Sequence, residues 1–162
     1  MTKNKIVLIA GDPNSINSEI IFKTWKKINN NIKKKIYLIV NFELFRLQLK
    51  KFNFKIKLIK VKNFHNDQKI NGLKIIDIPL NFSNPFKVTH KNSSKYIRKS
   101  LNLGHKLSND KKFKGLINCP INKGLIHKSK KTGVTEYLAS KCKIKDRSDL
   151  ILKKKKKLSV AP

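Results

Sequence analysis

Acidic residues are scarce in this chain of 162 residues: it holds 9 of them against 39 lysines and arginines, for a formal net charge of +30. Glycine, proline and cysteine are also few, with 6, 5 and 2 copies, which excludes a collagen-like or disulfide-stapled protein. No run approaches the ~18 consecutive apolar residues of a membrane span. The chain is long enough to bury the core of one domain. We therefore expect a folded cytoplasmic protein with reduced thiols at Cys119 and Cys142 and no membrane contact.

The positive charge is carried almost wholly by lysine, because only 3 of the 39 basic residues are arginine. Phosphate and base-edge recognition in nucleic acids favours the planar fork of arginine. The lysines are spread evenly, and they accompany 21 Ile and 18 Asn but only 3 Ala, the pattern of A/T-rich codons. This composition favours a solvated surface shaped by mutational drift and no specific nucleic-acid partner. A basic nucleic-acid-binding protein is the alternative from a different functional class.

Continuous β-branched runs alternate with amphipathic segments along most of the chain, which is typical of strands buried on both faces and helices that cover them. This alternation predicts an α/β fold with a mainly parallel sheet and helices on both faces. The expected strands are 6–10, 35–40, 55–61, 73–78, 113–118 and one starting at 150–152; the expected helices are 16–28, 42–51, one starting at 92, and 135–141.

The end of the chain departs from this pattern. Five lysines, 153–157, cross what should be a strand, and the sequence stops at Pro162 without a turn signal. Blocks of like charge are usually solvated tails. Residues 153–162 are therefore expected to be either a disordered tail or the point where a longer sheet is cut short.

Three connections carry the polar residues that could bind a ligand, since ligands of open parallel sheets bind outside the carboxyl ends of the strands. The first, 11–19, could present backbone N–H groups to a phosphate or carboxylate, although ordinary turn and cap chemistry explains it equally well. The second, 118–124, offers Asn122 and Lys123 to an anion. The third, 132–139, has Thr135 as a helix cap whose hydroxyl could also reach a ligand.

Metal and nucleophile patterns are missing from the sequence. The four histidines, at 65, 90, 105 and 127, show no metal-ligand spacing, and the nine acids are scattered. No Ser-His-Asp or paired-carboxylate constellation can be proposed. Catalytic residues are therefore unknown from the sequence alone.

Taken in order, the three connections resemble one family, the 4-hydroxythreonine-4-phosphate dehydrogenases of pyridoxal-phosphate biosynthesis. The first is similar to the family's G-[DE]-P-x-G-I-G-P-E segment, with Ser15, Asn17 and Ser18 in place of two glycines and a proline. The second resembles its G-P-[VI]-[NH]-K-G segment and the third its T-G-H-T-E-[FY]-L-A segment. Residues 92–97 are also similar to the start of the family's intervening helix. The resemblance covers the whole chain but only the N-terminal half of a family member.

The resemblance implies an NAD- or NADP-dependent oxidation of a phosphorylated hydroxy amino acid, followed by decarboxylation, with a divalent metal that polarises the substrate oxygen. It also implies a two-domain fold like that of isocitrate and isopropylmalate dehydrogenases, of which 1–162 would be the N-terminal part. The implied partners are a small phosphorylated substrate and either a second subunit in a homodimer or the missing C-terminal half.

Four residues carry over from the family motifs. Thr135 matches a substrate-binding threonine, and Asn122 and Lys123 match a loop near the active site. Val134 stands at the position of a substrate-binding histidine, and valine has neither a donor nor an acceptor. This change leaves a related phosphorylated sugar acid open as the substrate.

The family's three metal-binding histidines begin with a T-T-H segment that would lie just beyond Pro162. We therefore expect no complete metal site in this chain and little or no dehydrogenase activity from it alone. Whether it is an active enzyme or a fragment stays open at this point.

Overall fold

The computed structural model describes residues 4–62, 71–126, 133–142, 150–154 and 157–161. The elements follow the predicted alternation of strands and helices. They are β1 (Lys5–Ile9), α1 (Asn17–Lys27), α2 (Asn30–Lys33), β2 (Ile36–Val40), α3 (Phe42–Lys51), β3 (Leu58–Lys60), β4 (Leu73–Asp77), α4 (His90–Ser108), β5 (Phe113–Asn118), the 3-10 turn η1 (Lys123–Leu125), α5 (Val134–Lys141), β6 (Leu150–Lys154) and β7 (Lys157–Ala161).

Strands β1 to β5 form one sheet in the order β3-β4-β2-β1-β5, and every neighbouring pair in it is parallel. Parallel neighbours need crossover connections, and the helices between the strands supply most of them. All the carboxyl ends therefore lie at the same edge of the sheet. The prediction of a mainly parallel α/β sheet is confirmed.

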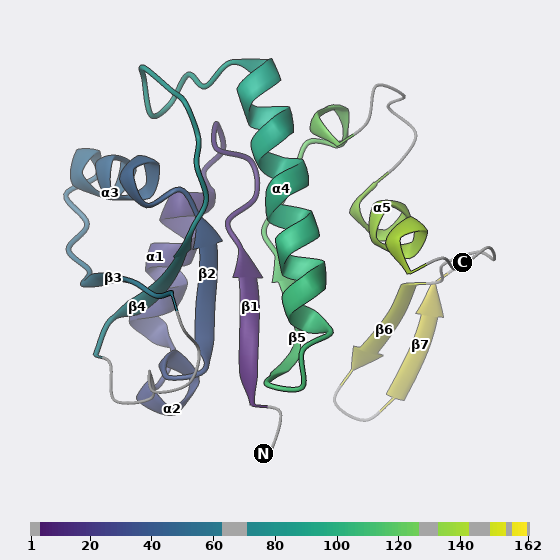
Figure 1. Ribbon diagram of the computed structural model, residues 1–162. Helices are drawn as coiled ribbons and strands as arrows, with labels where there is room; N and C mark the ends of the chain where they lie inside the picture. The colour runs from purple at the N-terminus through teal and green to yellow at the C-terminus, as the bar shows by residue number, and fades with distance from the viewer. Residues whose placement is uncertain (1–3, 63–70, 127–132, 143–149, 155–156, 162) are drawn as a thin grey trace.

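Helices cover both faces of this sheet, as predicted (Figure 1). Helix α4 packs on one face, where Tyr96, Ile97 and Leu101 join an apolar cluster with strand residues such as Val7 and Ile39. The other face is covered by α1 and α3, whose buried side chains form a second cluster with Leu38, Val40, Leu73 and Ile75. Two cores on opposite faces explain why the strands read as continuous apolar runs.

Helix α4 lies close to the sheet because of a glycine on its buried side. A Cβ atom at Gly104 would lie 2.7 Å from Cδ1 of Ile9 and 3.0 Å from Cδ1 of Leu116, both nearer than ordinary van der Waals contact. The absence of a side chain lets the helix axis approach β1 and β5. This packing fixes α4 beside the carboxyl ends of those two strands.

Two helix starts differ from the sequence prediction. Helix α1 begins at Asn17, with Ile16 at its N-cap and no side-chain cap hydrogen bond, although Asn14, Ser15 and Asn17 are of the residue types that favour this position. Helix α4 begins two residues earlier than expected, at His90, because the hydroxyl of Thr89 accepts a hydrogen bond from the backbone N–H of Asn92. Near α1 the side chains of Asn14 and Asn17 are used instead for long-range contacts, which are described below.

The expected strand near 150 is present as β6, and it pairs with β7 in a separate two-stranded antiparallel sheet. Part of the lysine run therefore belongs to strands, with Lys153 and Lys154 in β6 and Lys157 in β7. Whether residues 153–162 mark a truncated end stays a prediction. Within the described ranges, every helix falls short of the length and apolarity that a membrane crossing needs.

Candidate functional site

The first two predicted connections start side by side. Strands β1 and β5 are neighbours in the sheet, with Ile9 level with Asn118 at their carboxyl ends. Beyond the strands the loops stay in contact: the backbone N–H of Asp12 donates to the carbonyl of Pro120 at 3.3 Å, and Nδ2 of Asn17 donates to the same carbonyl at 2.9 Å. Segments about a hundred residues apart in sequence thus form one surface.

Gly11 permits this close approach. Its φ of +78° lies in the left-handed region that favours glycine, and an added Cβ would lie 2.6 Å from both Nδ2 of Asn17 and the carbonyl oxygen of Pro120. No side chain fits between the two loops. The single glycine therefore holds the protein's own loops together, rather than leaving room for a ligand.

Four backbone N–H groups of the first loop are used within the protein, so these four are not available to a phosphate. The hypothesis that the loop binds an anion stays a prediction. The N–H of Asp12 binds Pro120, that of Asn14 binds the carboxylate of Asp12 at 2.9 Å, and that of Ser15 binds the carbonyl of Asp12. The N–H of Asn17 binds the hydroxyl of Ser15 at 3.2 Å. These donors are used within the protein, so the alternative of turn chemistry is the correct one for them.

A further connection, 79–89, also reaches this edge, and sequence reasoning missed it. The side chain of Asn14 makes two hydrogen bonds of 2.8 Å with the backbone N–H and carbonyl of Val88. Gln48 of α3 is only 3 % exposed, and its amide donates to the carbonyls of Pro13 at 2.8 Å and Pro85 at 2.7 Å. The one sequence signal for this contact was a glutamine on the buried side of an amphipathic helix. Because buried polar groups are almost always hydrogen-bonded, such a glutamine indicates that polar groups of another segment pack against the helix.

The second predicted loop presents Asn122 and Lys123 to solvent. Asn122 caps η1, since its Oδ1 accepts from the backbone N–H of Gly124 at 3.0 Å, which leaves its amide N–H groups for other partners. Among the described residues the ammonium of Lys123 has no hydrogen-bonding or ionic partner. The loop can therefore offer both a cation and a neutral donor.

The second and third loops also lie together. A Cβ atom at Gly133, just before α5, would be 3.7 Å from Cε of Lys123. Gly133 is the N-cap of α5, and its N–H donates to the carboxylate of Glu136 at 2.8 Å. Thr135 is exposed in the first turn, so its predicted role as the helix cap is wrong while its hydroxyl remains accessible. Val134 is half-buried and packs against the apolar cluster under α4.

The cysteine within the second loop is buried, and burial lowers the reactivity of its thiol. Cys119 is 8 % exposed, and burial raises the pKa of its thiol to about 11. Cys142 is exposed, and its Sγ lies 3.2 Å from Nε2 of His105. Since the thiolate is the reactive form, the two thiols should differ strongly in reactivity.

We expect a thiol reagent at pH 8 to modify one cysteine of the native protein rapidly and the second only after unfolding. Mass spectrometry would identify the fast site as Cys142, and Cys142→Ser would remove the fast phase. Because a raised pKa keeps Cys119 protonated, its native labelling should grow only as the pH approaches 11. Equal labelling rates at pH 8 would contradict the burial of Cys119.

No group of three or more His, Cys, Asp or Glu side chains gathers within the part of the chain that the structure describes. His65 and His127 lie outside the described residues. The described donor set does not fit a divalent metal, because such sites need several oxygen or nitrogen ligands at one point.

A sequence model of the family described as pyridoxal phosphate biosynthetic protein PdxA matches residues 16–162, almost the whole chain. The chain belongs to this family. The match begins within the first loop and includes the whole of the second and third, which are the segments that meet at Lys123 and Gly133. No curated protein sequence matches the chain.

Solved structures with the same fold are about twice as long. A structure named provisionally as a 4-hydroxythreonine-4-phosphate dehydrogenase from Salmonella typhimurium superposes with a TM-score of 0.78 at 18 % identity, covering 97 % of this chain and 50 % of that one. The Klebsiella pneumoniae 4-hydroxythreonine-4-phosphate dehydrogenase gives 0.72 at 15 %, with 97 % and 50 % covered. The Burkholderia phymatum enzyme gives 0.69 at 18 %, with 95 % and 48 % covered. The chain thus spans about half the length of the structures it matches.

Proposed function

We propose that this chain is the N-terminal half of a 4-hydroxythreonine-4-phosphate dehydrogenase and carries one wall of its substrate site. Lys123, Asn122 and Thr135 are the binding residues of this wall. The observation that supports it most directly is the proximity of Lys123 to Gly133, since a Cβ atom at Gly133 would lie 3.7 Å from Cε of Lys123. The two segments that resemble the family motifs are therefore neighbours. The ligand is the phosphorylated hydroxy amino acid that the family name implies.

The chemistry of this wall suits an anion. Lys123 supplies a full positive charge, and the amide of Asn122 and the hydroxyl of Thr135 supply neutral donors. Val134 packs into the core and supplies no polar contact, so the wall makes fewer hydrogen bonds than the family motif would allow. These residues bind and orient the substrate; none of them is assigned a proton transfer.

The cofactor and metal belong to the proposal through the family alone. NAD or NADP would accept the hydride, and a divalent metal would polarise the substrate oxygen. The described residues bring together no set of metal ligands, and we assign none of them to hold either group. The two unpaired cysteines support the cytoplasmic location that we propose with this function.

Lys123→Ala tests the binding role. Removing a charge-assisted contact should weaken binding of 4-hydroxythreonine 4-phosphate by about tenfold or more. Calorimetric titration of the purified chain measures the dissociation constant. The expected loss comes without a change in thermal stability, because Lys123 is exposed.

Lys114→Ala is the matched control, since Lys114 is an exposed lysine at the other end of β5. It lowers the net charge equally and should leave the dissociation constant within about twofold. Equal losses in the two variants would mean that the substrate senses only the overall charge of the protein. That result would remove Lys123 from the site.

Metal titration tests whether the chain is a half-site. We expect Mg²⁺, Mn²⁺ or Zn²⁺ to bind weakly and without fixed stoichiometry, because the described residues bring no three ligands together. Isothermal titration calorimetry is the measurement. Tight one-to-one binding would show that this chain completes a metal site by itself.

The partner that completes the site is the polypeptide equivalent to the other half of the matched structures. One feature supports this: β5 is an edge strand of the five-stranded sheet that the structure describes, and its Ile117 is 55 % exposed. Light scattering should find the chain alone monomeric; a stable homodimer would favour a second copy of this chain instead.

A further inference from the structure

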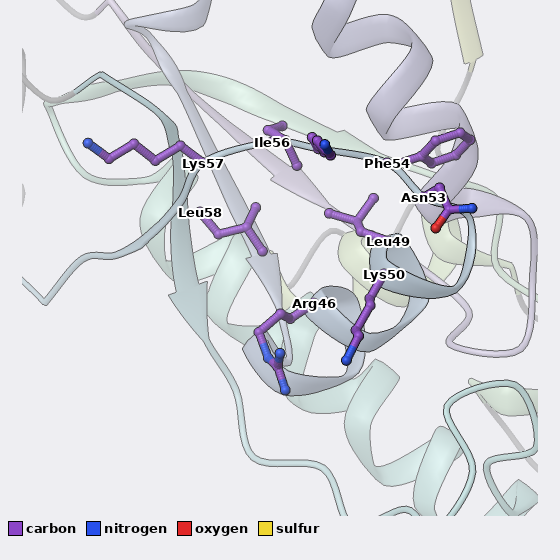
Figure 2. A pocket seen from close by; sticks show the side chains of 9 residues that line it. Arg46, Leu49, Lys50, Asn53, Phe54, Ile56, Lys57 and Leu58 are labelled. Carbon is purple, nitrogen blue, oxygen red and sulfur yellow. The ribbon is translucent and has the colours of Figure 1, made fainter.

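A cavity separate from the proposed substrate wall lies on the side of the molecule near β3, at the opposite edge of the sheet from β5. Its volume is about 640 Å³, within the range of ordinary small-ligand sites. Figure 2 shows Arg46 and Lys50 coming from α3 on one side, and Phe54, Ile56 and Lys57 from the following connection on the other.

The cavity exists because the chain reverses sharply at the end of α3. Asn53 adopts a φ of 56°, and its N–H donates to the carbonyl of Lys50 at 3.0 Å. The N–H of Phe54 donates to the carbonyl of Leu49 at 2.9 Å. This pair of bonds is a Schellman motif, which ends a helix and folds the next residues back along it. The connection therefore runs beside α3 and leaves a hollow between them.

The floor and wall of the cavity are apolar and held in place. Leu49 is 3 % exposed and belongs to the core beneath α3, and Ile56 and Leu58 are half-buried against the same core. The ring of Phe54 stacks on Phe22 of α1, with centroids 4.0 Å apart and planes 6° from parallel. A stacked aromatic and a buried leucine give a ligand a preformed apolar surface.

The rim is cationic. Arg46, Lys50, Lys55 and Lys57 line the opening, and none of the described residues that line it is acidic. Glu43 lies beside it, but its carboxylate is bound to Arg46 by two hydrogen bonds of 2.9 and 2.5 Å. Lysines are common over the whole surface of this protein, so a cationic rim alone does not indicate a binding site. A cationic rim above a rigid apolar floor does indicate one, because this combination suits a ligand with one charged end and one apolar end.

We propose that this cavity binds a small amphiphilic anion, meaning a flat or short apolar body that carries a carboxylate or phosphate. The body lies against Leu49, Ile56 and Phe54, and the charge faces Lys55 and Lys57. This site is independent of the proposed function, since none of its residues belongs to the substrate wall.

Phenyl phosphate, inorganic phosphate, benzoate and benzyl alcohol are probes that distinguish the contribution of the apolar end of the ligand from that of its charged end. Titration of the isotope-labelled chain, followed by amide chemical shifts, should place phenyl phosphate at residues 53–58. Its affinity should exceed that of inorganic phosphate by about tenfold, because the ring becomes buried. Benzoate should bind at the same place and benzyl alcohol more weakly, since the first keeps the negative charge and the second lacks it.

Paired lysine variants supply the control. The double variant Lys55→Ala/Lys57→Ala should weaken phenyl phosphate binding by about tenfold, whereas Lys87→Ala/Lys91→Ala, which removes two exposed lysines elsewhere, should change it less than twofold. Lys123→Ala should leave binding at 53–58 unchanged. Equal affinity for phenyl phosphate and inorganic phosphate, shifts scattered over the surface, or equal losses in the two double variants would overturn the proposal.

Discussion

Replacing Gly11 with alanine should lower the free energy of unfolding by about 3 kcal/mol, because two costs add. The backbone at position 11 has a φ of +78°, which strains any residue with a Cβ. The new methyl group would also lie 2.6 Å from the carbonyl oxygen of Pro120 and 3.0 Å from that of Cys119. Backbone atoms cannot move aside as a flexible side chain does, so the loops must separate. Urea denaturation monitored by circular dichroism measures the change.

Gly115→Ala is the matched control for this experiment. Gly115 lies in β5, and nothing is within 4 Å of the position of its Cβ. Alanine is favoured over glycine in a strand by about 0.5–1 kcal/mol, so this variant should be unchanged or slightly more stable. If Gly11→Ala were as stable as Gly115→Ala, the first and second loops would not be in contact.

Replacing Gln48 with glutamate should destabilise the protein by about 3 kcal/mol at neutral pH, although the two side chains have the same shape. The amide of Gln48 donates to the carbonyls of Pro13 and Pro85 in a site that is 3 % exposed. A carboxylate there would turn both donors into acceptors that face carbonyl oxygens. The first loop and the 79–89 connection would lose their shared anchor on α3.

The pH dependence gives this variant a signature of its own. Burial and the facing carbonyls should raise the folded-state pKa of the new carboxyl above its unfolded value of about 4.3. The folded state then holds the proton more tightly, so the defect should be largest above the folded pKa and shrink as the pH falls toward the unfolded pKa. Gln48→Met, which removes the donors without adding a charge, should show a smaller loss and no such pH dependence. Identical pH profiles for the two variants would contradict the assigned contacts.

The strands and their order of appearance were predictable because β-branched runs such as 36–40 are buried on both faces, and burial leaves its pattern in the sequence. Parallel pairing followed from the intervening helices. Parallel pairing in turn predicted that the loops after the strands lie together at the carboxyl edge of the sheet. This prediction needs no knowledge of side-chain contacts.

The long-range polar contacts could not be predicted in the same way. Asn14 is of a residue type that commonly caps helices, yet its side chain binds the backbone of Val88, 74 residues away. Thr135 likewise suits a cap, but α5 begins one residue before it, with Gly133 at the N-cap, so Thr135 lies inside the first turn. A local sequence pattern indicates which groups a side chain is able to hydrogen-bond. The tertiary fold determines which of these groups lies within reach.

The substrate roles of Asn122, Lys123, Val134 and Thr135 remain predictions, although the structure shows how they are placed. It brings Lys123 beside the start of α5 and leaves Thr135 exposed, while Val134 turns to the core. The valine at a family histidine position is the sharpest departure, because its apolar packing suits the fold and cannot replace a hydrogen bond.

Nuclear magnetic resonance titration with 4-hydroxythreonine 4-phosphate tests the substrate wall most directly. The amides of residues 122–124 and 133–136 should shift together and saturate at one ligand concentration, as expected when two connections bind one phosphorylated metabolite. Shifts confined to lysines scattered over the surface, each following its own concentration dependence, would mean that these loops are neighbours without forming a binding site.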